Sequence, residues 1–480
     1  MSENAQKVRR VEQQMIRKGS KYKKLYKFFD KLCFISKNHY NTVNYELRQR
    51  FIENDGKPES IPSYFDVSTE YRKLNGTQDL LGSSPASCIT KSIIDTWTGF
   101  KKSVMEFEKN PEKFCSVRGI DKELLTKTND KGIPLCKPSM PRYLDKEKGR
   151  YIFIFEGEGR GFKCIDDKGT YACTNKAINR IYQDATGESV LMLKSYRKEQ
   201  ECDKATLKQI RIVPKPDAYM LEFVYEITLE KEVAYESKYR TKEERAEQAK
   251  TETIADKAIA IKMGVNDFVT VVNNFGESPF ILSGDSFKPI IDEFIDKKAG
   301  LTAIATTLNG VHTTKRIQRL SYKLTRQTKY IANMYSKFIV DWCKEHDVTD
   351  VVLVKTKGMK QGLASKHAGL IPTAICENQI KYKLEEAGIN VKDVTSKSTK
   401  STSFLDLEPV ETKYENKTRI KDKMFVSNKG IKINSSVNTT YQAMRKRYAN
   451  AFSEKAMETV KIEPIYYAVV KEGSLKLREM

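Results

Sequence analysis

Cysteine and histidine, the usual ligands of structural zinc, are few and scattered in this chain. Its 480 residues include nine cysteines and four histidines, and no two cysteines form a C-x-x-C pair. Zinc sites in proteins are usually built from such closely spaced pairs. The odd number and wide spacing of the cysteines indicate reduced thiols rather than a disulfide framework. We therefore expect no zinc site.

Basic side chains outnumber acidic ones by a wide margin. The chain has 85 lysines and arginines against 63 aspartates and glutamates, a formal net charge of +22. An excess of this size favours a polyanionic partner. No run of about 18 apolar residues predicts a membrane span, and the N-terminal residues lack the apolar core of a signal peptide. Nucleic acid is therefore a better expectation than a membrane, although a merely soluble basic protein has the same composition.

The elements expected in the first half change from helices to strands. Apolar residues such as Leu25, Phe28 and Leu32 recur at helical spacing, which predicts a helical lobe over residues 1–135. From about Pro138 the period becomes that of strands. The strands are expected at residues 150–155, 189–196, 208–214 and 219–227. They predict a small β-barrel or sheet domain over residues 136–235.

The second half has an α/β pattern. A highly charged segment without an apolar stripe, residues 236–254, is interpreted as a linker. Strands are expected at residues 257–264, 268–274, 280–284, 348–355 and 389–394, and a helix at residues 371–388. A long helix is expected from about Thr313 to His346. Its apolar stripe contains Ile317, Leu320, Leu324, Ile331, Tyr335, Phe338 and Trp342, and a different face carries Arg316, Arg319, Lys323 and Arg326.

This order of elements resembles an RNase H-like fold, and several segments resemble the transposon-encoded TnpB family, relatives of type V CRISPR effectors. The segments that carry the resemblance are residues 36–51, 137–153, 207–227, 258–272, 350–362, 395–409 and 432–446. The resemblance implies an α+β multidomain protein. It implies a helical recognition lobe that includes part of the wedge, a β-barrel wedge domain, and a RuvC-like RNase H-fold domain over residues 255–480.

The resemblance also implies a nuclease site of three carboxylates. Two Mg²⁺ ions about 4 Å apart need hard oxygen ligands that converge on them. At the three implied positions this chain has Lys262, Ser396 and Ser436. A lysine ammonium only donates hydrogen bonds and repels a cation, and two serines do not replace two anions. We therefore expect no catalytic residues and no bound magnesium.

Neither nearby acids nor a zinc ribbon is expected to supply a metal site here. Asp393 lies three residues before Ser396, so in a strand it faces the other side of the sheet. Asp406 and Glu408 are expected in the loop beyond that strand. Many members of the family carry a cysteine-rich zinc ribbon, but residues 397–433 contain neither cysteine nor histidine.

The function implied is RNA-guided DNA binding without cleavage, as in nuclease-dead TnpB-like repressors of transcription. A guide RNA and a double-stranded DNA target with a short adjacent motif are the expected partners, in a prokaryotic cytoplasm and on the nucleoid. Expected contacts to nucleic acid are made by Arg48, Arg50, Arg316, Arg319, Lys323, Arg326, Lys360, Gln361 and Lys400. Two alternatives stay open: an active RNA-guided DNA endonuclease, and a guide-independent accessory DNA-binding protein of a transposon.

Overall fold

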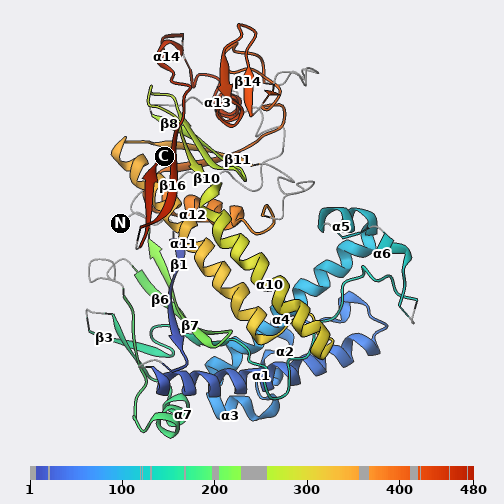
Figure 1. Ribbon diagram of the computed structural model, residues 1–480. Coiled ribbons are helices and arrows are strands. Elements are labelled where there is room, and N and C mark those ends of the chain that lie inside the picture. The colour runs from blue at the N-terminus through green and yellow to red at the C-terminus, as the bar shows by residue number, and fades with distance from the viewer. Residues whose placement is uncertain are drawn as a thin grey trace. The chain divides into compact units, whose positions relative to one another are not determined.

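Two compact units make up the chain in a computed structural model (Figure 1). The N-terminal unit spans Lys7–Thr228, and the C-terminal unit begins at Leu229. The structure describes residues 7–19, 22–118, 120–121, 123–129, 132–166, 169–196, 205–228, 257–355, 367–410, 420–421, 423–452, 454–472 and 474–480. The expected linker at residues 236–254 lies outside these ranges. No helix in them is long and apolar enough to cross a membrane.

Helices cover much of the N-terminal unit. They are α1 (Lys23–Glu53), α2 (Tyr64–Tyr71), α3 (Thr77–Leu81), α4 (Ser83–Lys109), α5 (Pro111–Arg118), α6 (Glu123–Thr126) and α7 (Lys176–Thr186). The apolar residues of α1 and α4 recur every three to four positions, so each helix buries one face. On α1 that face includes Phe28, Leu32 and Val43, and on α4 it includes Ile93 and Trp97.

The strands of the N-terminal unit form two sheets. The larger sheet has the order β1-β7-β6-β2, and the smaller has the order β3-β4-β5. The strands are β1 (Lys7–Arg17), β2 (Phe153–Glu156), β3 (Phe162–Asp166), β4 (Thr170–Cys173), β5 (Met192–Lys194), β6 (Ala205–Lys215) and β7 (Ala218–Thr228). The strands expected over residues 136–235 are confirmed.

The expected closed barrel is not found among the described residues. In a barrel every strand is paired on both sides. Here β1 and β2 are the two edges of the larger sheet. β2 has only four residues, whereas β1, β6 and β7 each have 11. A short strand such as β2 offers too few backbone groups to close the sheet onto β1.

The helices and sheets of the N-terminal unit share one hydrophobic core. Phe28 of α1, Trp97 of α4, Phe155 of β2 and Phe223 of β7 belong to the same buried cluster. The expected boundary near residue 135 falls inside this unit. A division into a helical recognition lobe and a wedge domain stays a prediction.

A seven-stranded sheet is the centre of the C-terminal unit, in the order β12-β11-β8-β9-β10-β16-β17. The strands are β8 (Ala258–Met263), β9 (Asp267–Asn273), β10 (Phe280–Ser283), β11 (Asp350–Lys355), β12 (Asn390–Thr395), β16 (Ile465–Glu472) and β17 (Ser474–Glu479). β8, β11 and β12 are parallel neighbours, and β9 runs antiparallel to β8. Three short strands, β13 (Ile420–Lys421), β14 (Met424–Val426) and β15 (Lys432–Asn434), form a separate small sheet.

Helices cover both faces of the central sheet. They are α10 (Lys288–Asn309), α11 (Lys315–Glu345), α12 (Thr373–Glu386), α13 (Ser435–Arg447) and α14 (Glu454–Thr459). One face packs against α10, α11 and α12, and the other packs against α13. Because β8 and β11 are covered on both faces, they read as nearly continuous apolar runs.

The expected strands and the long helix of this unit are confirmed, and α11 spans all but the ends of the range expected for it. The helix expected at residues 371–388 is α12, and Gly388 follows it with a positive φ of 72°. The sequence pattern does not predict α10, because only Ile291, Phe294 and Ala305 of its 22 residues are buried. Three buried positions do not produce a visible apolar stripe.

Candidate functional site

Lys262 occupies a core position near the end of β8. Ala258 and Ala260 belong to the core on the α13 side of the sheet, whereas Ile259 and Ile261 belong to the core on the opposite side. Since side chains alternate along a strand, Lys262 takes the next place on the α13 side. Only 9% of its surface is exposed. An amine therefore stands where the strand pattern has apolar side chains.

The Lys262 ammonium points to the first turn of α13. Its Nζ donates a hydrogen bond to Ser436 Oγ at 3.3 Å. The turn is held by Asn434, whose side-chain oxygen accepts from the backbone N–H groups of Ser436 at 2.7 Å and Val437 at 3.2 Å. This is a side-chain N-cap, which satisfies backbone donors at the helix start. Two of the three positions implied by the family resemblance, Lys262 and Ser436, are thus in contact.

Burial sets the protonation chemistry of this lysine. The pKa of Lys262 is lowered to about 8, first by loss of water around the buried ammonium and then by the nearby charge of Lys400, while Asp267 acts in the opposite direction. Burial penalises the charged form of an amine. The ammonium is therefore held in a site where Asp267 offsets only part of the penalty.

Ser396 lies two strands away from Lys262. In the sheet Lys262 pairs with Val354 of β11, and Val354 pairs with Val394 of β12. Ser396 follows the end of β12, and neighbouring strands are about 4.8 Å apart. The backbones of β8 and β12 are therefore roughly 10 Å apart, with β11 between them. The structure therefore does not bring Ser396 together with the other two positions.

The neighbour of Lys262 on β11 is a residue that the sequence analysis missed. Val354 lies at the level of Lys262 and packs into the same core as α13. A carboxylate on β11 at this point would lie within one strand spacing of a ligand on β8. Local spacing in the sequence gives no sign of this, because the pairing of β8 with β11 becomes visible only with the order of the strands.

The nearby acids are engaged elsewhere. Asp393 forms ion pairs with Lys355 at 3.6 Å and with Lys381 at 3.9 Å. Its carboxylate is therefore held by these two lysines. The carboxylate of Asp406 accepts from the Asn428 backbone N–H at 2.7 Å. Glu408 accepts from the Ser403 backbone N–H at 2.7 Å.

A metal ion does not fit the residues around Lys262. In the described part of the chain, the carboxylate of Asp267 acts on the charge of this lysine, and it accepts a hydrogen bond from Asn434 Nδ2 at 3.4 Å. Across the described ranges, no group of three or more histidine, cysteine, aspartate and glutamate side chains is placed to hold a metal ion. A single carboxylate beside a buried ammonium does not make a magnesium site.

The turn after β8 is fixed by a glycine. The Gly264 N–H donates to the Phe268 carbonyl at 2.9 Å. A Cβ at position 264 would lie 2.2 Å from the Asp267 carbonyl oxygen. Only glycine allows the two strands to approach so closely. This turn sets the positions of Lys262 and Asp267 on either side of it.

The two arginines expected to contact nucleic acid from α1 differ in their surroundings. Arg48 donates from Nε to the Pro141 carbonyl at 3.2 Å and lies 4.8 Å from the Tyr143 ring centroid. Its guanidinium therefore links α1 to the segment that follows α6. Arg50 is exposed.

The α11 residues expected to contact nucleic acid lie along a groove between α10 and α11, which run side by side (Figure 1). The groove has a volume of about 580 Å³ and is lined by Lys297, Gly300, Leu301, Ile304, Arg316, Arg319, Leu320 and Lys323. Arg326 is exposed on the same helix. Lys323 is 3.4 Å from Glu293 of α10, so its charge is partly neutralised. Lys360 and Gln361 lie outside the described residues.

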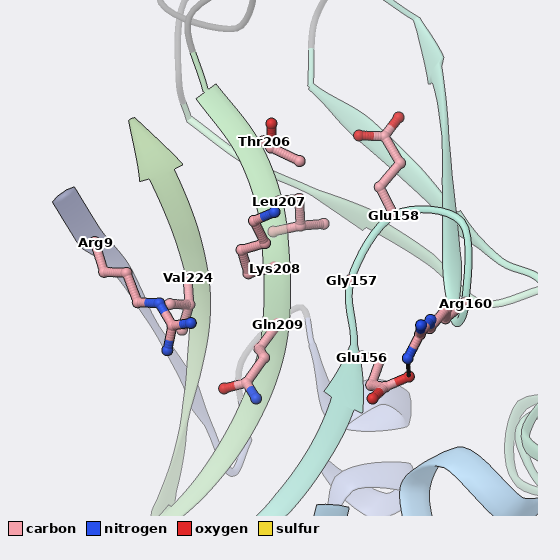
Figure 2. Close-up of a pocket in the computed structure, with 10 residues that line it drawn as sticks. All are labelled: Arg9, Glu156, Gly157, Glu158, Arg160, Thr206, Leu207, Lys208, Gln209 and Val224. Carbon is pink, nitrogen blue, oxygen red and sulfur yellow. Dashed lines mark ion pairs between the residues drawn. The ribbon is translucent and has the colours of Figure 1, made fainter. Parts of the chain in front are cut away.

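A second hollow, in the N-terminal unit, has a mixed lining. Figure 2 shows Arg9, Arg160 and Lys208 together with Glu156 and Glu158 around a cavity of about 350 Å³. Glu156 pairs with Arg160 at 3.6 Å. Lys208 pairs at 3.2 Å with Glu226, which is outside the lining. Positive and negative charges largely cancel here, so this hollow is a weaker candidate for binding a polyanion.

The comparisons with known proteins bear on the region that holds Lys262. Residues 231–360 match the OrfB_IS605 family model, described as a probable transposase. The match includes β8, β9, β10, both of the long helices α10 and α11, and β11. No curated protein matches the chain.

The fold is similar to that of a solved structure described as the Cas12f1-sgRNA-target DNA complex. The TM-score is 0.54 at 15% sequence identity, over 88% of this chain and 82% of that chain. Two further structures match with lower TM-scores. A CRISPR-Cas12f ternary complex has a TM-score of 0.33 at 14% identity, over 88% of this chain and 81% of that one. The mini-RNA-guided endonuclease CRISPR-Cas_phi3 has a TM-score of 0.44 at 9% identity, over 95% and 93%.

Proposed function

We propose that this chain is an RNA-guided DNA-binding protein that occupies its target without cutting it, and so represses transcription. The observation that carries the proposal is the contact between Lys262 and Ser436. The family resemblance implies a metal-binding carboxylate at each of these positions. An ammonium donates hydrogen bonds and repels Mg²⁺, so a two-ion mechanism has no place to assemble.

Two findings support the binding half of the proposal. The fold is shared with Cas12f1, whose solved structure contains a single guide RNA and target DNA. The net charge of +22 suits a polyanionic partner. In such proteins the guide RNA reads the sequence by base pairing, while the protein holds the heteroduplex by its backbone. Occupancy alone then excludes a polymerase or a competing protein.

Cleavage is tested on the RNA-loaded protein with matched double-stranded DNA and Mg²⁺. We expect full binding in a gel-shift assay and intact DNA on a denaturing gel under the same conditions. The binding assay is the control, because it separates a missing nuclease site from a missing complex. Nicking or cutting that a chelator abolishes would instead favour an active endonuclease.

The guide is tested by sequencing the RNA that co-purifies with the protein. We expect one dominant RNA species with a segment complementary to a DNA target. Ribonuclease treatment should then abolish the preference for that target. Target-selective DNA binding by RNA-free protein would favour the guide-independent accessory protein.

A further inference from the structure

The Lys262 ammonium has hydrogen-bond donors to spare. A lysine ammonium carries three donors, and one is used on Ser436 Oγ at 3.3 Å. In the ranges that the structure describes, no further acceptor takes the other two. Burying a charge without partners is costly unless another group compensates it. The side chain is therefore poised for an anion.

Ser436 adds a donor at the same point. Its Oγ accepts from Lys262, so its hydroxyl hydrogen is left to donate, and no acceptor for it is found within the described parts of the chain. At this helix start the backbone N–H groups of Ser436 and Val437 donate to the Asn434 side chain, and that of Ser435 donates to the Lys423 carbonyl. The helix terminus itself is thus not the binding group, and the two side chains are.

The surrounding charges favour an anion on balance. Lys400 is exposed and is close enough to lower the pKa of Lys262, whereas Asp267 has the opposite effect. The three groups together carry one net positive charge. Ser436 is partly exposed, so the pair lies near the surface of the unit.

We propose that Lys262, Ser436 and Lys400 form a subsite for one backbone phosphate of the target DNA. A phosphodiester has two free oxygens and one negative charge. These match an ammonium and a hydroxyl that donate side by side, with a second ammonium nearby. The subsite rests on the proposed function, and it gives the replaced metal position a role in holding DNA.

The first measurement is the dissociation rate of matched DNA from the RNA-loaded protein. Lys262→Met removes the charge and keeps a long side chain that suits the apolar neighbours Ala260 and Val354. We expect dissociation to accelerate about tenfold or more, the range for a charge-assisted contact. Lys344→Met, which removes an exposed lysine at the end of α11, is the matched control and should leave the rate unchanged.

Ser436→Ala is the second variant. It keeps the lysine charge and removes only the hydroxyl, so we expect a smaller acceleration of a few-fold. Dissociation identical to wild type for both Lys262→Met and Ser436→Ala would overturn the subsite. That result would leave Lys262 as a buried lysine without a ligand.

A scan of neutral methylphosphonates along each DNA strand locates the phosphate. At one position the substitution should speed dissociation from wild type but have no further effect on Lys262→Met, because both changes remove the same contact. Additive effects at every position would overturn the proposal. The same scan on single-stranded DNA without guide RNA separates the phosphate subsite from the proposed RNA-guided function. A coupled position there, with no guide-directed binding, would retain the subsite and reject the proposed function.

Inorganic phosphate distinguishes a free ion from a DNA backbone. If phosphate raises the melting temperature of wild type but not of Lys262→Met, while both release DNA at the same rate, the site takes the free ion and the DNA assignment is wrong. If the wild-type protein binds no nucleic acid at all, both the proposed function and the subsite are rejected.

Discussion

A lysine at the end of a buried strand lowers the stability of the folded chain unless an anion compensates it. Lys262 continues a row of small apolar residues, and Asp267 acts on it without a direct hydrogen bond. The family resemblance singled out Lys262 and Ser436, and the structure has these two side chains in contact. The resemblance could not show their contact, because they lie on a strand and a helix that are far apart in the chain.

The pH dependence of stability tests the burial of Lys262. A pKa that falls from 10.5 to about 8 corresponds to about 3 kcal/mol lost from the folded state at neutral pH. Between pH 8 and pH 10.5 the unfolded chain binds more protons at Lys262 than the folded chain does. The free energy of unfolding therefore rises with pH across this range. Lys400 and Asp267 are the charged groups that face this amine.

We expect Lys262→Met to be more stable than wild type at pH 7 and this advantage to shrink as the pH rises from 8 to 10.5. Melting temperatures of DNA-free protein at pH 7, 8, 9 and 10 measure the difference. Lys344→Met serves as the reference for loss of an exposed lysine. A constant difference between Lys262→Met and wild type across these pH values would show that the ammonium is not buried in solution.

At the scale of elements, the sheet order decides which residues can act together. Periodicity predicted β2 and β5 to β12, because β-branched and aromatic runs are strong local signals. It did not predict β1, β3, β4, β16 or β17. It did not predict that β11 lies between β8 and β12, which places Val354 rather than a residue of β12 beside Lys262. Neighbours in a parallel sheet are set by long crossovers, which leave no local mark.

The basic face of α11 is expected to contact nucleic acid. Changing Arg316, Arg319, Lys323 and Arg326 together to glutamine should weaken nucleic-acid binding and flatten its salt dependence. The expected loss is about one unit of log–log slope per lost phosphate contact. Binding constants at several salt concentrations measure the slope, and Lys344→Gln on the same helix is the control.

The single variants should differ. Lys323→Gln should change the slope least, because Glu293 lies 3.4 Å from the lysine and already neutralises part of its charge. Arg316→Gln and Arg326→Gln remove exposed charges and should change it more. A slope that stays at the wild-type value in the quadruple variant would mean that this face is simply solvated.

For the whole molecule, the composition and the order of the elements predicted most of the general architecture. The sequence shows a surplus of basic residues. It also predicts helices and strands in the first half and an α/β pattern in the second half. The open sheets of the N-terminal unit were not, because closure depends on how many backbone groups the edge strands offer to each other. The single core that joins its helices to its strands was also not visible, since burial partners distant in sequence leave no periodic signal.

The whole protein should silence a gene and leave its DNA intact. In bacterial cells that carry the protein, a matching guide and a plasmid reporter, we expect reporter transcripts to fall while the plasmid is retained at its normal copy number. A mismatched guide is the control. Guide-dependent loss of the plasmid would contradict the proposal.

The pairing of Lys262 with Val354 limits how easily point mutations could create a metal site at this point of the sheet. A two-ion centre needs several oxygen ligands together. A single mutation to a carboxylate at position 262 would still face an apolar valine and a neutral serine. A mutant with only one carboxylate in place would therefore gain no nuclease activity, so selection for cutting would not favour it. A population of cells that relies on this protein for binding should not give rise to spontaneous nuclease revertants.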